Sequence, residues 1–325
     1  MSSSWQEALR TAWTELARHP AQNRQFRTRR LSEHLPIDAY AGLRAVDDSP
    51  CLLIEPAPTS ETNFEVGGMR LGIVAGDRAP LLVLSLEDRS RLDLFTTVCA
   101  DALAASDTDR NTAIPGFLAR LDAWRRFLRD RRSGLSRAET VGLLGELLIL
   151  IELLGLRPDA LADWKSPDDG LHDFERGGHA LEIKTSLGPA SSIRISRLDQ
   201  LDSSGLRKLD LLHVRFIEAH DGITLESAID RIRTIISDDA SLRAFDNALL
   251  RRGLMPDDTA ARAAPRVQLR AMDGYGVDGD FPRLDRLRLP QAVIEAEYTL
   301  DVRALTAFAT DASEVLHRFN DGGPA

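Results

Sequence analysis

The pattern of hydrophobic and polar positions changes character along the chain. An amphipathic helix is expected at 5–17, and the residues up to about 110 then contain short apolar or alternating runs separated by proline and glycine, which is typical of strands. The expected strands are 51–54, 64–74 and 81–86, followed by a helix at 93–105 and a connector at 106–115. The pattern therefore predicts a small α+β module at residues 1–112.

From residue 117 onward, helical periodicity alternates with strand-like runs. The clearest helix start is Ser136, which forms a capping box with Glu139, and Gly155 and Pro158 mark the end of that helix. Further strands are expected on both sides of Gly177-Gly178 and at 192–195, 209–217, 267–271 and 294–300, with helices at 225–236, 242–250 and 304–319. Interleaved strands and helices predict an α/β domain with a mixed sheet at residues 113–325.

Composition narrows the class of protein without naming a function. Of 325 residues, 43% are apolar and 28% are charged, which is ordinary for a globular protein. The two cysteines, Cys51 and Cys99, lack the spacing of a zinc site or a disulfide framework. No apolar stretch is long enough to span a membrane, and the N-terminus does not resemble a secretory signal. We therefore expect a cytoplasmic protein without a membrane segment.

The charge distribution gives two opposite indications about nucleic acid. A net charge of −9 does not favour binding to phosphates. Arginines nevertheless cluster after residue 119: Arg120, Arg125, Arg126, Arg129, Arg131, Arg132 and Arg137, against Asp122 and Asp130. This cluster is either a solvated helix face or a phosphate-contacting face, in which Arg125, Arg126 and Arg129 are the substrate-binding candidates.

The strongest candidate for chemistry is a predicted β-hairpin closed by Gly177-Gly178, a pair suited to a two-residue turn with positive φ. In the resulting register Arg176 pairs with His179, so Asp173 lies directly opposite Glu182. Lys184 follows two residues after Glu182 and points to the same face. The hairpin is therefore expected to bring two carboxylates and a lysine together.

Two carboxylates held opposite each other repel, and a divalent cation offsets that repulsion. Carboxylate oxygens suit Mg²⁺ or Mn²⁺ better than zinc. Lys184 can then orient a water molecule or stabilise charge on a phosphate under attack. The alternative is a solvated surface hairpin in which Lys184 only neutralises the acids.

Glu146 lies on a helix that is apolar on almost every side. A carboxylate in such surroundings is costly unless it is paired or bound to a cation, so Glu146 needs a partner, either the metal or an arginine. Gly142 and Gly145 weaken the same helix, and the close approach of another backbone, such as the sheet, explains their presence. Glu146 therefore joins Asp173 and Glu182 as a candidate metal ligand.

Short motifs follow one another in a fixed order along the chain. They are Gly142-Leu-Leu-Gly-Glu146-Leu-Leu, Trp164-Lys-Ser-Pro167, His172-Asp-Phe174, Leu181-Glu-Ile-Lys-Thr185, Ile195-Ser196 with Gln200-Leu201, Tyr275, Asp280-Phe-Pro-Arg-Leu284 and Tyr298. In order and spacing they resemble the bacterial PD-(D/E)XK motif proteins, which were long described as a domain of unknown function and are encoded in phage-defence and restriction gene clusters. The resemblance covers most of the chain and is most specific between Gly142 and Leu201.

This resemblance implies a restriction-endonuclease-like core, a mixed sheet flanked by helices, behind the smaller N-terminal module. Glu146, Asp173, Glu182 and Lys184 match the acidic, metal-binding and lysine positions of the family. The literal Pro-Asp pair is Pro167-Asp168, so Asp168 or Asp169 stays an alternative to Asp173, although the hairpin geometry favours Asp173.

Four further side chains near this region have two interpretations each. Ser196 and Gln200 are either substrate contacts or local capping groups. His172 and His179 flank the hairpin and could be taken for zinc ligands. The register turns His172 away from the acidic face, so we do not expect it to bind a metal.

The leading hypothesis is an Mg²⁺- or Mn²⁺-dependent endonuclease that hydrolyses DNA in a restriction or phage-defence system, because three acids and one lysine are all present. The alternative is a catalytically silent or partner-dependent nucleic-acid-binding or scaffold subunit, with a helicase or methyltransferase as partner. A nucleotide-cofactor enzyme is disfavoured because no glycine-rich phosphate loop is present. Cutting both strands with one site per chain would suggest a homodimer.

Overall fold

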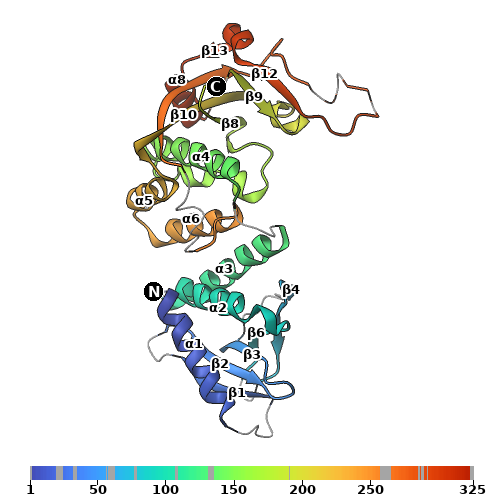
Figure 1. Cartoon of the computed structure of the whole chain (residues 1–325), viewed down its shortest axis with the longest axis vertical. Coiled ribbons are helices and arrows are strands. Elements are labelled where there is room, and N and C mark those ends of the chain that lie inside the picture. Colours follow the sequence, from blue (N-terminus) through green and yellow to red (C-terminus); the bar gives the residue numbers. More distant parts are fainter. Residues whose placement is uncertain are drawn as a thin grey trace. The chain divides into compact units, whose positions relative to one another are not determined.

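The computed structural model describes residues 2–19, 25–31, 35–55, 57, 63–76, 79–106, 109–130, 135–189, 191–256, 265–284, 286, 289–290 and 292–322. The chain divides into two compact units, Met1–Arg132 and Ser133–Ala325 (Figure 1). The division lies after residue 132 rather than after 112, because the intervening helix packs against the helix before it.

The N-terminal unit is an antiparallel sheet packed with helices. Its strands, in the order β1-β2-β3-β6-β5-β4, are joined by antiparallel pairing only. The elements are α1 (Ser2–Ala17), β1 (Phe26–Arg30), β2 (Asp38–Arg44), β3 (Pro50–Glu55), β4 (Phe64–Val66), β5 (Met69–Val74), β6 (Leu81–Leu86), η1 (Arg89–Arg91), α2 (Leu92–Ser106) and α3 (Arg110–Asp130). Helix α1 packs on β2 and α2, where Trp13 stacks on Phe95. The predicted α+β character of this unit agrees with these elements.

Two sequence predictions in this unit were wrong for local reasons. Residues 64–74 form two strands, β4 and β5, because Gly67 and Gly68 adopt positive φ values of 60° and 74° and turn the chain. The expected connector at 106–115 is largely the first turns of α3, which contains Pro115 inside the helix. Pro115 is the sixth residue of α3, so it removes one helical hydrogen bond without ending the helix.

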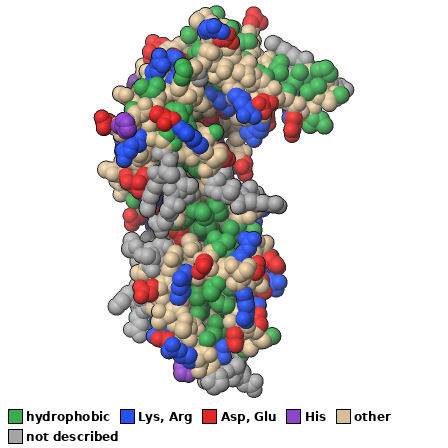
Figure 2. Space-filling view, viewed as in Figure 1, with side chains coloured by type: hydrophobic (Ala, Val, Ile, Leu, Met, Phe, Trp, Pro, Cys, Tyr) green, Lys and Arg blue, Asp and Glu red, His purple; other side chains and the backbone are tan. Residues whose placement is uncertain are grey.

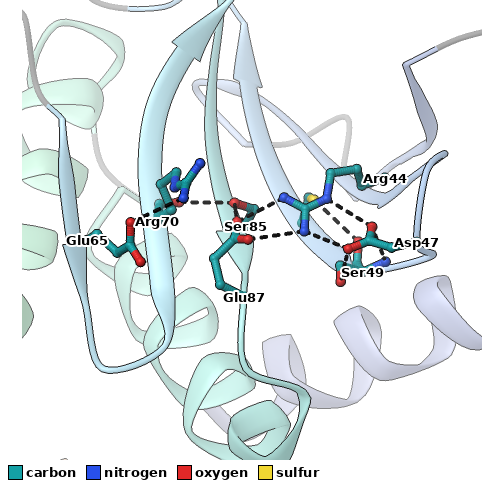
Figure 3. Close-up of polar contacts among 8 residues, drawn as sticks. Arg44, Asp47, Ser49, Glu65, Arg70, Ser85 and Glu87 are labelled. Carbon is teal, nitrogen blue, oxygen red and sulfur yellow. Dashed lines mark hydrogen bonds and ion pairs between the residues drawn. The ribbon is translucent and has the colours of Figure 1, made fainter.

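A polar cluster lies at one end of the same sheet (Figure 3). Arg44 of β2 donates to both carboxylate oxygens of Asp47 and also to Glu87, and Ser85 of β6 donates to Glu87 at 2.6 Å. The Arg44 guanidinium holds the pKa of Asp47 well below its usual range. One guanidinium thus bridges two carboxylates, so its donors are used within the cluster.

Both cysteines belong to this unit and both are buried. Cys51 on β3 and Cys99 on α2 have no exposed surface. Burial raises the pKa of the Cys51 thiol to about 12 and raises that of Cys99 well above its usual value. They are small apolar core residues, as the sequence predicted.

The C-terminal unit is built around a mixed five-stranded sheet, as predicted. Its order is β13-β11-β10-β8-β7, with β8 and β10 parallel and the other pairs antiparallel. Strands β9 and β12 form a separate antiparallel pair. The elements are α4 (Arg137–Leu156), η2 (Ala160–Asp163), η3 (Ser166–Asp168), β7 (Phe174–Arg176), β8 (His179–Leu187), β9 (Ser192–Ile195), η4 (Leu198–Leu201), β10 (Lys208–Ile223), α5 (Leu225–Ile235), α6 (Asp239–Arg251), β11 (Val267–Gly276), β12 (Tyr298–Asp301), η5 (Val302–Phe308), β13 (Ala309–Thr310) and α8 (Ala312–Asn320).

Local signals placed the start of helix α4 correctly. Ser136 caps α4 through the predicted capping box with Glu139. The expected single helix at 304–319 is instead η5, the two-residue strand β13 and α8, because Ala309 and Thr310 pair with β11 and Asp311 caps a new helix.

The two faces of the sheet are covered differently. One face carries Leu181, Ile183, Leu212 and Val214 and packs against α4, α5, α6 and α8. The opposite face is apolar only in part: its core includes Leu209, Leu211 and Tyr275, together with side chains of β9 and β12. The first face therefore holds the main core, and the second face carries Glu182 and Lys184.

The two glycines of α4 meet different surroundings. A Cβ atom on Gly145 would lie 2.2 Å from Oγ1 of Thr185 on β8, whereas one on Gly142 would meet no described atom within 4 Å. The predicted close approach of the sheet thus applies to Gly145 alone.

We expect Gly145→Ala to lower the free energy of unfolding by about 1–3 kcal/mol through overpacking. We expect Gly142→Ala to raise it by up to about 1 kcal/mol through helix propensity. Urea denaturation compares the two variants, and equal effects would contradict the assigned contact.

Candidate functional site

Strand β8 presents the two central residues of the predicted site on one face. Glu182 is 2% exposed, and the Lys184 ammonium donates to Glu182 Oε1 at 2.7 Å. Parallel pairing sets Leu211 and His213 of β10 beside Glu182 and Lys184. A buried carboxylate and a mostly buried lysine therefore form a close pair in the middle of the sheet.

Asp173 reaches the same place by a route different from the predicted one. The β7–β8 ladder follows the expected register, with Arg176 opposite His179, but it ends at Phe174 opposite Leu181. Beyond that point the Asp173 carboxylate accepts a hydrogen bond from the Ile183 amide at 2.7 Å. The side chain of Asp173 thus takes the place of a strand partner along β8, next to Glu182.

Glu146 projects from α4 and is held by Trp164, Ser166 and Arg252. The indole of Trp164 donates to its Oε2 at 2.9 Å, and the guanidinium of Arg252, directly after α6, donates to its Oε1. The side chain of Glu146 is 7% exposed. The partner that this buried glutamate requires is therefore an arginine, which is the alternative that the sequence left open.

The three acids act on one another electrostatically. Burial, followed by the charge of Asp173, raises the pKa of Glu182 to about 8, although Lys184 opposes the shift. Burial also raises the pKa of Glu146 to about 7; Arg252 opposes this shift and Asp173 adds to it. Two buried glutamates with raised pKa values, close to a third carboxylate, are typical of a functional site.

The arrangement fits a divalent cation at Asp173 and Glu182 rather than at all three acids. Within the described residues, no three His, Cys, Asp or Glu side chains lie close enough to share one ion. Mg²⁺ commonly uses one or two protein carboxylates and completes its shell with water and phosphate oxygens. Asp173 and Glu182 supply such a pair, and the raised pKa of Glu182 indicates that its charged form would gain from a nearby cation.

The other acids and histidines proposed from the sequence lie elsewhere. Asp168 forms an ion pair with Arg251 at 3.0 Å, and Asp169 adopts a positive φ of 57° at the end of η3. His172 contacts Glu175 at 3.4 Å, and buried His179 contacts Asp210 at 2.7 Å. Neither Asp168 nor Asp169 is among the main charges that act on Glu182.

The predicted substrate-binding residues are engaged in local contacts. The Gln200 side-chain oxygen accepts hydrogen bonds from the Ser196 amide, the Ser196 hydroxyl and the Arg197 amide, and so caps η4. Arg125 and Arg126 pair with Asp122 on α3 of the N-terminal unit, and Arg129 lies on the same helix. A role of these residues in substrate binding stays a prediction.

Sequence reasoning missed Arg252 and the polar neighbours of Lys184 on the sheet. Arg252 is 106 positions from Glu146, and no spacing rule connects them. Ser186 and His213, whose side chains lie 2.9 Å apart, follow from the parallel pairing of β8 with β10. The only available signal was the alternation of polar residues Glu182, Lys184 and Ser186 along β8.

Comparison with known families gives one match over most of the chain. The family model described as "Putative PD-(D/E)XK family member, (DUF4420)" matches residues 9–303. No curated protein and no solved structure matched the chain. No helix in the described part of the chain is long and apolar enough to cross a membrane.

Proposed function

Because this chain belongs to the PD-(D/E)XK family described as DUF4420, with a restriction-endonuclease-like core, we propose that it is a metal-dependent endonuclease that hydrolyses DNA phosphodiester bonds. The observation that carries the proposal is the triplet of Asp173, buried Glu182 and Lys184, with the lysine 2.7 Å from Glu182. The gene-cluster setting of the proteins it resembles supports a role in restriction or phage defence.

Each residue of the triplet has a distinct task in this proposal. Asp173 and Glu182 would hold Mg²⁺ or Mn²⁺, which when bound supplies Lewis-acid polarisation of the scissile phosphate and lowers the pKa of bound water. Lys184 donates hydrogen bonds and positive charge where a phosphate oxygen becomes more negative, and orients the attacking water. Glu146, held by Trp164 and Arg252, lies beside the acidic site on α4, and its role as a metal ligand stays a prediction.

The presence of lysine rather than arginine at position 184 supports a role of this residue in the chemistry. The chain has only three lysines, Lys165, Lys184 and Lys208, among 41 lysines and arginines. Arginine satisfies most cationic positions, but it cannot lose its proton and its planar head has a different geometry. Most cations of this chain are arginines, so the lysine beside the buried glutamate indicates that this position requires a small ammonium group.

A partner-dependent subunit is the second candidate function. Arg252 already satisfies Glu146, the net charge is −9, and acidic and basic side chains are mixed over the face shown in Figure 2. These features favour a chain that needs another subunit, such as a helicase or methyltransferase, to bring DNA to the site. A second copy of this chain is the simplest source of a second cut.

The test is cleavage of supercoiled plasmid and single-stranded DNA by the purified chain with Mg²⁺ or Mn²⁺, compared with Asp173→Ala. We expect metal-dependent cutting by the parent and loss of cutting in the variant, since Asp173 holds the metal and aligns with Glu182. Cutting by both proteins would locate the activity outside this site. Cutting by neither would favour the partner-dependent subunit.

A further inference from the structure

A row of polar side chains continues from Lys184 across three strands of the C-terminal sheet. Ser186 follows Lys184 on the same face of β8, His213 and Arg215 share that face on β10, and Asp273 lies opposite His213 on β11. We call Ser186, His213, Arg215 and Asp273 the polar row. Its members carry no role in the proposed cleavage chemistry.

The polar row is connected internally but not satisfied. His213 Nε2 lies 2.9 Å from Ser186 Oγ, and Arg215 Nη2 lies 2.7 Å from Asp273 Oδ2. His213 is 1% exposed, yet its Nδ1 has no hydrogen-bond partner among the described residues, and the same holds for the buried Nε of Arg215. Buried polar atoms without partners are costly, so such atoms point to a ligand or ordered water at the site.

A nucleophilic serine is the bolder explanation for neighbouring Ser, His and Asp side chains. Two observations disfavour it. Burial lowers the pKa of His213 to about 4, which makes the imidazole a poor base near neutral pH. Arg215 also neutralises Asp273, the residue that would have to support a charged imidazole. The row is therefore better suited to binding than to catalysis.

The position of Ser186 indicates what it binds. Residues two apart on a strand are separated by about 6.6 Å, so Ser186 lies one such step from Lys184 on the same face. Successive phosphates along a nucleic-acid strand are separated by a comparable step. Ser186 is half-buried and its hydroxyl can rotate, and the half-buried Arg215, ion-paired with Asp273, lies beside it on β10.

The geometry points to a second phosphate subsite: Ser186, positioned by His213 and flanked by Arg215, binds the backbone phosphate next to the scissile one. The subsite rests on the proposed nuclease function, since it takes the scissile phosphate to lie at Glu182 and Lys184. Ser186 is the binding residue, and His213 is a positioning residue that fixes its hydroxyl.

The experiment measures binding of a fluorescent DNA duplex by anisotropy in Ca²⁺, and single-turnover cleavage in Mg²⁺, for the parent, Ser186→Ala, His213→Gln and the control Ser204→Ala. Ser204 is an exposed turn residue of the same unit. We expect Ser186→Ala to weaken binding about tenfold, since a hydrogen bond to a charged oxygen is lost. The maximal cleavage rate at saturating protein should change little. His213→Gln should act in the same direction, and Ser204→Ala should match the parent.

A neutral methylphosphonate, placed at one backbone position at a time, identifies the contact. When the methylphosphonate replaces one particular phosphate next to the scissile one, it should weaken DNA binding by the parent. The same DNA should bind Ser186→Ala as tightly as unmodified DNA does. The subsite would be overturned if the parent and Ser186→Ala bound DNA equally, or if methylphosphonates affected both equally at every position. Neither result would contradict the proposed nuclease function. Binding with this pattern but without cleavage would overturn the nuclease alone. Absence of DNA binding by the parent would overturn both.

Discussion

Lys184→Arg should cut DNA about 10²- to 10⁴-fold more slowly than the parent in single-turnover assays with saturating Mg²⁺. The substitution keeps the positive charge beside Glu182, so the loss would come from the shape and fixed protonation of the guanidinium. Lys184→Met should cut at least as slowly, and it also leaves the buried Glu182 without its cation.

The matched control is Lys208→Arg. Lys208 lies on β10 and pairs with Asp278 at 2.7 Å, away from Glu182, so the same exchange should leave the cleavage rate unchanged. Circular dichroism and urea denaturation of all three variants separate a loss of chemistry from a loss of fold. A Lys184→Arg protein that cuts as fast as the parent would remove Lys184 from the proposed machinery.

Arg252→Met should destabilise the protein in a manner that depends on pH. At pH 8 we expect the loss to exceed that at pH 5 by about 1–1.5 kcal/mol, because Glu146 without its ion-pair partner must either be buried charged or take up a proton. The pKa of Glu146 is already raised to about 7, and without Arg252 it should rise further. When the pKa of a carboxyl is raised in the folded state, the protein becomes less stable as the pH rises above the pKa of that carboxyl in the unfolded state. Near pH 5 the protonated Glu146 should therefore make the loss small.

Urea denaturation at pH 5 and pH 8 tests this expectation. Adding Glu146→Gln to Arg252→Met should restore most of the stability at pH 8, because no buried charge then remains. Arg231→Met is the matched control, since Arg231 is an exposed arginine of α5. If Arg252→Met lost the same free energy at both pH values, its effect would not act through the charge of Glu146.

Local features of the fold were predictable from sequence. The Gly177-Gly178 turn and the capping box at Ser136 depend on residues only a few positions apart, and the structure has both. The turn fixed the register of β7 and β8, and the alternation of side chains along β8 placed Glu182 and Lys184 on one face. Where local chemistry decides the backbone, the sequence was sufficient.

The remainder depends on contacts between distant parts of the chain. Arg252 and Glu146 are 106 positions apart, and Arg318 reaches buried Asp210 across 108 positions. No periodicity in the sequence indicates either pair. Asp173 was expected in a direct cross-strand pair, but its carboxylate instead binds the backbone of β8, since the ladder ends one residue earlier. Such outcomes are decided by packing, which single-residue propensities do not encode.

The two buried cysteines give the protein a reporter of local opening. Both lie in the N-terminal unit, and residues 133–325 contain none. A thiol with a raised pKa and no exposed surface reacts with alkylating reagents only when the surrounding structure opens. The rate of thiol labelling therefore measures opening of the N-terminal unit alone. It can show whether that unit becomes more or less protected when DNA or metal is added to the intact chain.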